Sequence, residues 1–241
     1  MRINELNCFT KIKESYFKHI GAKKEFDNSD YLTMASIFNG THQNEKQNEF
    51  PDFLFDDGAI EHFEVTASKE TRKGSKYTID DIKKNKDTEQ YFDELDKEFL
   101  KSNYHPGELI TASREDVHKC FSYDAFTKSF KRNTSKHLVS LRKSSYCEKI
   151  VIFLIEQQGA RLCVYRNNIF DKFYQLSDDK NLLIYIKDNM SDVNYIIFTA
   201  ADAYEILDLS KIDTLISNAK ENQDIRGGTR RNVSLKLYND I

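Results

Sequence analysis

The stretch PDFLFDDGAIEHFEVT, residues 51–66, predicts a β-hairpin around which the rest of the chain is organised. Two apolar, strand-like segments lie on either side of Asp56-Asp57-Gly58, which is a strong turn signal. Gly58 can take the positive φ that closes a three-residue loop with a bulge. In the register set by that loop, Asp52 lies opposite His62.

Two acidic residues of this hairpin are expected to face each other. Side chains alternate across a strand, so His62, Glu64 and Thr66 share one face, and the three-residue loop places Asp52 diagonal to Glu64. Both carboxylates can then reach one cation, whereas a two-residue loop would put them on opposite sides. Facing carboxylates on a half-buried sheet cost free energy unless a positive charge lies between them. Their hard oxygen atoms suit Mg²⁺ or Mn²⁺, which are the expected cofactors.

A solvated hairpin whose acidic side chains face water is the alternative interpretation. Asp56 and Asp57 fit it because they lie in the turn, and Glu61 fits it because it is out of phase with Glu64 along the strand. His62 shares the face of Glu64, where the pattern is as compatible with a role at the surface as with a catalytic one.

Length and composition are those of an ordinary globular chain. Its 241 residues suffice for one large domain, and 39% of them are hydrophobic and 31% charged. No apolar run approaches the length of a membrane span, and the N-terminus lacks the apolar core of a signal peptide, so a cytoplasmic location without a membrane partner is expected. The cysteines form no CxxC pair and have no histidine at zinc-finger spacing, which predicts reduced, packed thiols: Cys8, Cys120, Cys147 and Cys163.

The order of apolar patterns predicts an α/β domain. Large apolar residues at helical spacing predict helices over 4–20 and 29–38. The run KIVIFLIE, residues 149–156, predicts a strand buried on both faces, and residues 161–166 are expected to form a hairpin with it. The remaining expected elements are a short strand at 109–113, a strand pair at 193–200 and 203–209, a helix near 212–219 and a polar tail at 224–232.

A highly charged segment interrupts this order at about residues 69–106. Its pattern predicts one or two exposed helices, which we interpret as an insertion or lid rather than as part of the core. The chain is therefore expected to be a single domain over residues 1–241, with a charged helical insertion.

Charge is unevenly distributed along the chain, whose net charge is −3. Residues 49–68 contain six acidic residues and no lysine or arginine, whereas residues 119–143 contain seven basic residues and one acidic residue. An acidic and a basic cluster that met in the fold would suit a metal ion and a polyanion. The basic residues fall in a predicted amphipathic helix over 123–146, whose polar side carries Lys128, Arg132, Lys136 and Lys143.

Together these residues resemble the PD-(D/E)XK nuclease superfamily, which has the restriction-endonuclease-like fold. Pro51-Asp52 is followed by Glu64-Val65-Thr66, with Glu64 twelve positions after Asp52. A helix precedes this motif, and a basic helix and an apolar strand follow it. The resemblance covers roughly residues 1–68 and 120–200, and it implies a central mixed sheet flanked by helices.

The resemblance implies a metal-dependent nuclease that hydrolyses phosphodiester bonds, with DNA as the expected partner and restriction or phage defence as the setting. By the resemblance, Asp52 and Glu64 bind the metal, and the Val65 carbonyl is a further ligand. Glu5 would be the first-helix glutamate that many members direct at the metal, with Glu14 as the rival candidate. Many members act as dimers, so a homodimer is compatible with the resemblance.

Thr66 departs from the family pattern, because a lysine usually occupies this position. That lysine orients or deprotonates the attacking water and stabilises the phosphate charge, which a neutral hydroxyl cannot do. Lys69 is the nearest local substitute, but in phase with a strand it would point to the wrong face. The basic helix is the better source, with Lys136 as the expected substitute and Lys128, Arg132 and Lys143 as contacts to the nucleic-acid backbone.

A degenerate nuclease fold is the second functional interpretation, and Thr66 favours it. Such a module would bind nucleic acid through the basic helix, or a protein partner through the charged insertion. Arg226, Arg230 and Arg231 could add contacts to a nucleic-acid backbone, although a disordered tail explains this segment equally well. His137 falls on the apolar side of the basic helix, where a packed role is expected.

Overall fold

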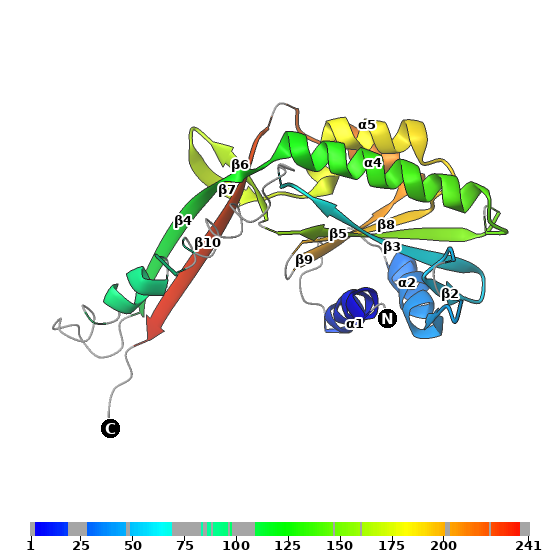
Figure 1. Cartoon of the computed structure of the whole chain (residues 1–241), viewed down its shortest axis with the longest axis horizontal. Coiled ribbons are helices and arrows are strands. Elements are labelled where there is room, and N and C mark those ends of the chain that lie inside the picture. Colours follow the sequence, from blue (N-terminus) through cyan, green and yellow to red (C-terminus); the bar gives the residue numbers. More distant parts are fainter. Residues whose placement is uncertain are drawn as a thin grey trace, which may run out of the picture.

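A six-stranded mixed sheet with helices on both faces forms the centre of the computed structural model (Figure 1). Its three central strands are parallel neighbours, and the strands outside them are antiparallel. The predicted α/β class, with a mixed sheet flanked by helices, is therefore confirmed. In spatial order the strands are β1 (His42–Gln43), β2 (Phe53–Phe55), β3 (Gly58–Thr66), β5 (Ile150–Gln158), β8 (Tyr195–Ala200) and β9 (Ala203–Asp208).

The residues that the structure describes include the strands of this sheet and the helices that pack on it. Within the predicted insertion, the described positions all lie between 83 and 97, and they are helical. Lys69 and the side chains of Arg230 and Arg231 lie outside the described part. The structure describes residues 3–18, 28–46, 49–68, 83, 86–87, 89–95, 97, 109–146, 148–159, 161–200, 203–221 and 223–236.

No helix within these ranges combines the length and the apolar character needed to cross a membrane.

Two helical layers cover the central sheet, and each layer encloses its own apolar core (Figure 1). Alternation along β5 divides its side chains, so that Phe153 packs into one core and Leu154 into the other. β5 is thus buried on both faces, as its continuous apolar run predicts. One layer contains α1 (Ile3–Phe17) and α2 (Asn28–Gly40), and the other contains α4 (Tyr123–Arg142), α5 (Lys180–Asn189), α6 (Ile212–Asn218) and the short turns η1 (Leu176–Asp178) and η2 (Leu209–Lys211).

A second, four-stranded sheet contains two segments that the sequence patterns misassigned. The predicted short strand at 109–113 is part of a 14-residue strand, and the predicted polar tail at 224–232 is a strand that pairs with it. This antiparallel pair extends away from the central sheet (Figure 1). The tail contains few apolar residues, so hydrophobic periodicity could not identify it. In spatial order the strands are β4 (Leu109–Ser122), β10 (Asp224–Lys236), β6 (Leu162–Arg166) and β7 (Ile169–Phe173).

The predicted hairpin between β5 and β6 is wrong, because β6 belongs to the second sheet. Both edges of β5 are occupied by β3 and β8, so β6 has no edge of β5 to pair with. β6 instead forms a hairpin with β7 through Asn167 and Asn168, whose φ angles are 53° and 62°. Asparagine adopts this left-handed region more readily than most residues, which makes the Asn-Asn pair a usable turn signal.

The turn at Asp56-Asp57 contains two residues and not the predicted three. Phe55 pairs with Gly58, so the register differs by one position from the expected register. Gly58 is also not needed for a positive φ, since Gly159 is the described glycine that has one. A Cβ atom at Gly58 would overlap the carbonyl oxygen of Ile150 and the ring of Phe55. The glycine therefore permits the close approach of β5.

We expect Gly58→Ala to lower the free energy of unfolding by about 1–3 kcal/mol, because the added methyl group must displace β5 from β3. Gly40, the last residue of α2, provides a matched control, since a Cβ atom there meets nothing within 4 Å. Gly40→Ala should stabilise the chain by about 0.5–1 kcal/mol. Denaturant unfolding measures both changes, and equal stability of the two variants would contradict the packing at Gly58.

Candidate functional site

The outer edge of β3 is lined by side chains beyond the point where β2 ends. β2 pairs with residues 58–60, and the main chain of the next residues of β3 bonds to side chains on this edge. Asp52, just before β2, supplies one of these side chains and α4 supplies the other two, so the edge lies between a predicted hairpin acid and the predicted basic helix. The three bonds are His62 N to Asp52 Oδ2 at 2.8 Å, Asn133 Nδ2 to Glu64 O at 3.0 Å, and Thr66 N to Ser129 Oγ at 3.1 Å.

Asp52 is buried and held at this edge. Its carboxylate accepts the His62 N–H, and its carbonyl oxygen accepts the Asn44 N–H at 2.9 Å. The two-residue turn rules out the predicted diagonal pairing with Glu64, but the carboxylate lies at the strand edge, level with His62. Glu64 follows two positions later, about 7 Å along the strand. The predicted diagonal contact between Asp52 and Glu64 is therefore wrong, and their binding of one cation stays a prediction.

We expect Asp52→Ala to lower the free energy of unfolding by about 1–3 kcal/mol, because the buried His62 N–H loses its acceptor. Asp52→Asn keeps an oxygen acceptor at the same place and should lose less stability. Denaturant unfolding of the two variants measures the difference. Equal stability of Asp52→Ala and the wild type would show that this bond contributes nothing to the fold.

Glu61 and His137 form a pair on the opposite face of β3, beneath α4. Glu61 Oε1 lies 2.6 Å from His137 Nδ1, and the imidazole ring stacks on Phe63 at a centroid distance of 4.5 Å. Both residues are at least partly buried. Glu61 is out of phase with Glu64 and His137 is packed, as predicted, but the expectation that Glu61 faces water is wrong, because its side chain is buried against His137 under α4.

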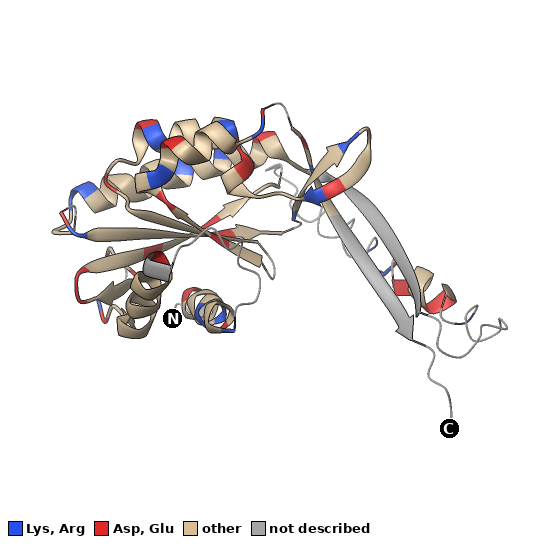
Figure 2. Ribbon diagram, turned by 180° about the vertical axis from the view of Figure 1, so that it is seen from behind, with Lys and Arg blue, Asp and Glu red and all other residues tan. Residues whose placement is uncertain are grey.

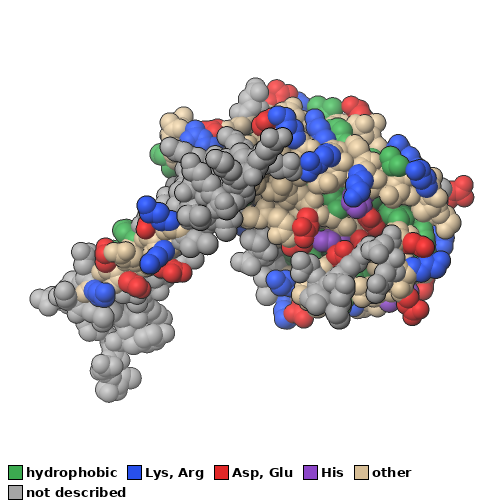
Figure 3. All heavy atoms as spheres, in the orientation of Figure 1, with side chains coloured by type: hydrophobic (Ala, Val, Ile, Leu, Met, Phe, Trp, Pro, Cys, Tyr) green, Lys and Arg blue, Asp and Glu red, His purple; other side chains and the backbone are tan. Residues whose placement is uncertain are grey.

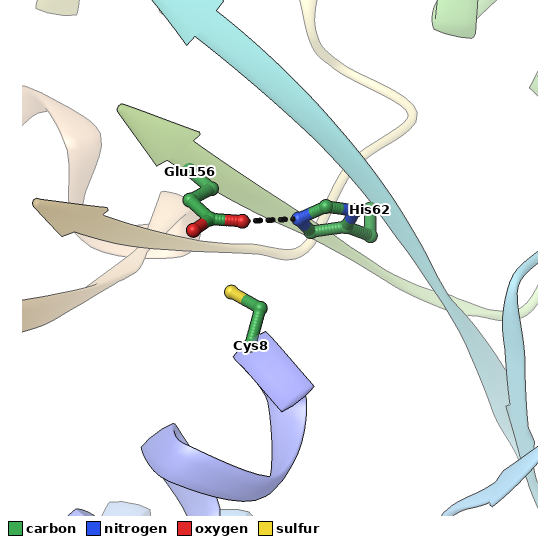
Figure 4. A group of neighbouring side chains, drawn as sticks. All are labelled: Cys8, His62 and Glu156. Carbon is green, nitrogen blue, oxygen red and sulfur yellow. Dashed lines mark hydrogen bonds and ion pairs between the residues drawn. The ribbon is translucent and has the colours of Figure 1, made fainter. Parts of the chain in front are cut away.

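Glu64 and Glu156 lie side by side at the carboxyl ends of the parallel strands β3 and β5. Their face of the sheet is covered by α1, which contributes Cys8 (Figure 4). The hydrogen bond from His62 lowers the pKa of Glu156 despite partial burial, so this carboxylate is charged at neutral pH. Burial and the charge of Glu156 raise the pKa of the Cys8 thiol. Ligands commonly bind at the carboxyl ends of parallel strands, so the carboxyl ends of β3 and β5 are a candidate site.

Of the two predicted helix glutamates, Glu5 is the one on the buried side of α1. It lies one turn before Cys8 on the same side of the helix, and its Oε2 atom is buried. Glu14 is exposed and lies 3.5 Å from Lys18, which is also exposed. The Val65 carbonyl points toward β5, because the Glu64 carbonyl points to the outer edge and successive carbonyls alternate. Its role as a metal ligand stays a prediction.

A pocket of about 360 Å³ lies between the end of β3 and the first turns of α4. Thr66 at the end of β3 and Ser68 just beyond it line one side, and α4 contributes the acidic Asp124 and the basic Lys128 and Arg132. The Thr66 hydroxyl accepts the Ser68 N–H at 3.0 Å. Lys128 and Arg132, two of the predicted nucleic-acid contacts, therefore lie beside Thr66, the position at which the superfamily usually has a lysine.

Lys136 and Lys143 lie further along α4 and do not line this pocket. The rise of an α-helix places Lys136 about 12 Å and Lys143 about 22 Å from Lys128. Both are exposed, and Lys136 continues the row of Lys128 and Arg132 at four-residue spacing. The structure consequently makes Lys128 a better candidate than Lys136 for the cation beside Thr66.

Basic and acidic side chains are segregated on the face that carries this edge. Figure 3 shows Lys and Arg side chains over α4 and, below them, a group of acidic and His side chains. On the side seen in Figure 2, Lys and Arg alternate with Asp and Glu along the helices. Ion pairs elsewhere in the helical layer include Arg142 with Asp192 at 2.7 Å and Lys187 with Asp213 at 2.5 Å. The segregated face is thus the one suited to a polyanion.

Sequence reasoning missed Glu156 and Cys8 as candidate site residues. Glu156 ends an otherwise apolar strand, and a charged residue at the carboxyl end of a buried parallel strand is a signal that could have identified it. Cys8 carries no such signal, because its neighbours His62 and Glu156 are far away in the sequence. Compared with family models, curated proteins and solved structures, the chain matches none of them.

Proposed function

We propose that this chain is a metal-dependent nuclease of the restriction-endonuclease-like kind, with DNA as the expected substrate. The observation that carries the proposal is the pocket where the hydroxyl-bearing Thr66 and Ser68 meet Lys128 and Arg132. Hydroxyl groups and basic side chains are the groups that proteins use to bind phosphate oxygens. Glu64 lies about 7 Å before Thr66 along the strand, so a phosphate in the pocket would have an acidic metal ligand nearby.

The carboxylates at the edge of β3 fit a hard divalent cation. Asp52 is held in place by the His62 N–H, and Glu64 is exposed to solvent. Mg²⁺ in proteins commonly takes one or two carboxylates and keeps several water molecules, and Mn²⁺ accepts similar ligands. When bound, such an ion would lower the pKa of a coordinated water and offset charge on the phosphate. Glu5 is a further candidate ligand, whereas the Val65 carbonyl, which the resemblance also implies as a ligand, points toward β5 and away from this edge.

Lys128 and Arg132 supply, in this proposal, the positive charge that Thr66 lacks. The Lys128 Nζ atom lies 2.8 Å from Asp124 in an exposed ion pair, which a phosphate oxygen can replace at little cost. The Arg132 guanidinium can bind two phosphate oxygens at once. The Thr66 hydroxyl accepts one hydrogen bond and keeps its proton for donation to the phosphate.

The exposed row of basic residues on α4 would bind the phosphates of the DNA strand on either side of the cleaved bond. Lys128, Arg132 and Lys136 follow one another at intervals of one helical turn, and Lys143 lies near the end of the helix. Such contacts to phosphates set affinity and orientation without reading the base sequence. Lys136, predicted as the catalytic lysine, is thereby assigned a binding role.

A binding module without catalysis is the second candidate function. It is favoured by Thr66, which leaves the strand without the family's lysine, and by Asp52, whose carboxylate has a structural role in holding the His62 N–H. In that case α4 would bind nucleic acid, and the acids would serve the fold alone. The two functions differ in their need for metal: cleavage requires a metal ion, whereas binding through α4 does not.

Incubation of the purified chain with supercoiled DNA, single-stranded DNA and RNA, each with Mg²⁺ or Mn²⁺, separates the two functions. We expect cleavage of at least one DNA substrate that stops when EDTA removes the metal. A gel shift that persists in EDTA, without cleavage under any metal condition, would favour the binding module. Substrate-free and heat-inactivated samples exclude cleavage by a contaminant.

A further inference from the structure

Three metal-ligating side chains converge between α1 and the sheet, and each comes from a different element (Figure 4). Cys8 of α1, His62 of β3 and Glu156 of β5 place one ligand atom each within 4.8 Å of the other two. His62 Nε2 lies 3.1 Å from Glu156 Oε2, and the Cys8 side chain points toward this pair. Cys8 and His62 are 7% and 6% exposed, so the cluster is largely closed to solvent.

These separations are close to those of a tetrahedral zinc site. Bonds of about 2.3 Å to sulfur and 2.0–2.2 Å to nitrogen or oxygen place neighbouring ligand atoms roughly 3.3–3.7 Å apart. The His62–Glu156 distance already falls near this range, and a small movement of Cys8 would complete it. Zinc sites with three protein ligands take water in the fourth position.

We propose that Cys8, His62 and Glu156 bind a divalent transition-metal ion, with Zn²⁺ as the expected occupant. Its three ligands are different residues from the proposed Mg²⁺ ligands Asp52 and Glu64, although Glu64 is the neighbour of Glu156 in the sheet, and its chemistry differs. Thiolate and imidazole prefer Zn²⁺, whereas Mg²⁺ prefers oxygen ligands alone. The inference therefore does not depend on nuclease activity.

Binding would change the state of the thiol. Without metal, the Cys8 thiol stays protonated, because burial and the nearby carboxylates disfavour the thiolate. A coordinating thiol loses its proton to solvent when the cation binds, and the cation then offsets the local negative charge. The ion would also tie α1 to β3 and β5, so binding should stabilise the folded chain.

Cobalt substitution tests the site directly, because a cobalt–thiolate bond gives a near-ultraviolet charge-transfer band. We expect one Co²⁺ per wild-type chain, a band that excess Mg²⁺ does not remove, and its displacement by one equivalent of Zn²⁺. In Cys8→Ser the band should disappear and the affinity should fall by about 100-fold or more. Cys163→Ser is the matched control, because Cys163 is also a buried free cysteine and should leave the band unchanged.

Two results would overturn the proposal. One is the absence of stoichiometric Co²⁺ or Zn²⁺ binding by the wild-type chain, which is independent of any variant. The other is an unchanged charge-transfer band in Cys8→Ser. Should Cys8→Ser fail to fold by circular dichroism, Glu156→Gln replaces it, and an unchanged Co²⁺ affinity in that variant would also overturn the proposal.

Discussion

Glu64→Gln is expected to reduce metal-dependent cleavage by about 1,000-fold while leaving the free energy of unfolding unchanged. Glutamine has nearly the same shape as glutamate but lacks the negative charge that a hard cation requires. Glu64 is exposed at the edge of the sheet, so the substitution disturbs no buried packing. The loss should therefore be one of activity alone.

Initial rates of DNA cleavage in Mn²⁺, measured alongside denaturant unfolding, test this expectation. Glu49→Gln is the matched control, because Glu49 belongs to the same acidic segment but lies in an exposed pair with Lys46 at 3.7 Å. Its cleavage rate should equal that of the wild type. Wild-type cleavage by Glu64→Gln would remove Glu64 from the proposed site, and a loss of folding would make Glu64 a structural residue.

Lys128→Ala combined with Arg132→Ala should weaken DNA binding by about 100-fold at low salt. The two side chains are the basic residues that line the Thr66 pocket. Removing two phosphate contacts should also reduce the slope of log affinity against log salt by about two. Lys136→Ala should produce a smaller change, because this residue lies about 12 Å further along the helix.

Fluorescence anisotropy with a labelled oligonucleotide in EDTA, repeated over a range of salt concentrations, provides the measurement. Lys180→Ala combined with Lys187→Ala removes the same charge from α5, where both lysines form ion pairs with acidic residues. This control should leave the affinity and the salt slope close to wild type. An equal loss in both double variants would mean that net charge, and not the pocket, determines binding.

Periodicity predicted the elements whose apolar residues repeat at short range. The run at 149–156 became β5, and the helical spacing around Phe126 and Phe130 became α4 with both side chains fully buried. These predictions succeeded because the spacing of apolar residues within one segment shows whether one face or both faces are buried. Strand β10 has no such apolar pattern, and its partners β4 and β6 lie elsewhere in the chain.

The details of the candidate site depend on contacts between distant residues. The two-residue turn is coupled to the approach of Ile150 to Gly58, which no pattern within the hairpin could reveal. The choice between Lys128 and Lys136 depends on where α4 crosses the edge of β3, and Ser129 fixes that position through Thr66. Local residue types therefore predicted the basic helix, but not which of its residues lie beside the end of β3.

Anomalous diffraction from a crystal of the chain soaked in Mn²⁺ tests whether the edge of β3 binds a metal ion. We expect an anomalous peak at this edge, within coordinating distance of the Asp52 and Glu64 carboxylates and beside the pocket lined by Thr66, Lys128 and Arg132. An ordered edge without an anomalous peak, or a peak confined to another part of the molecule, would contradict it.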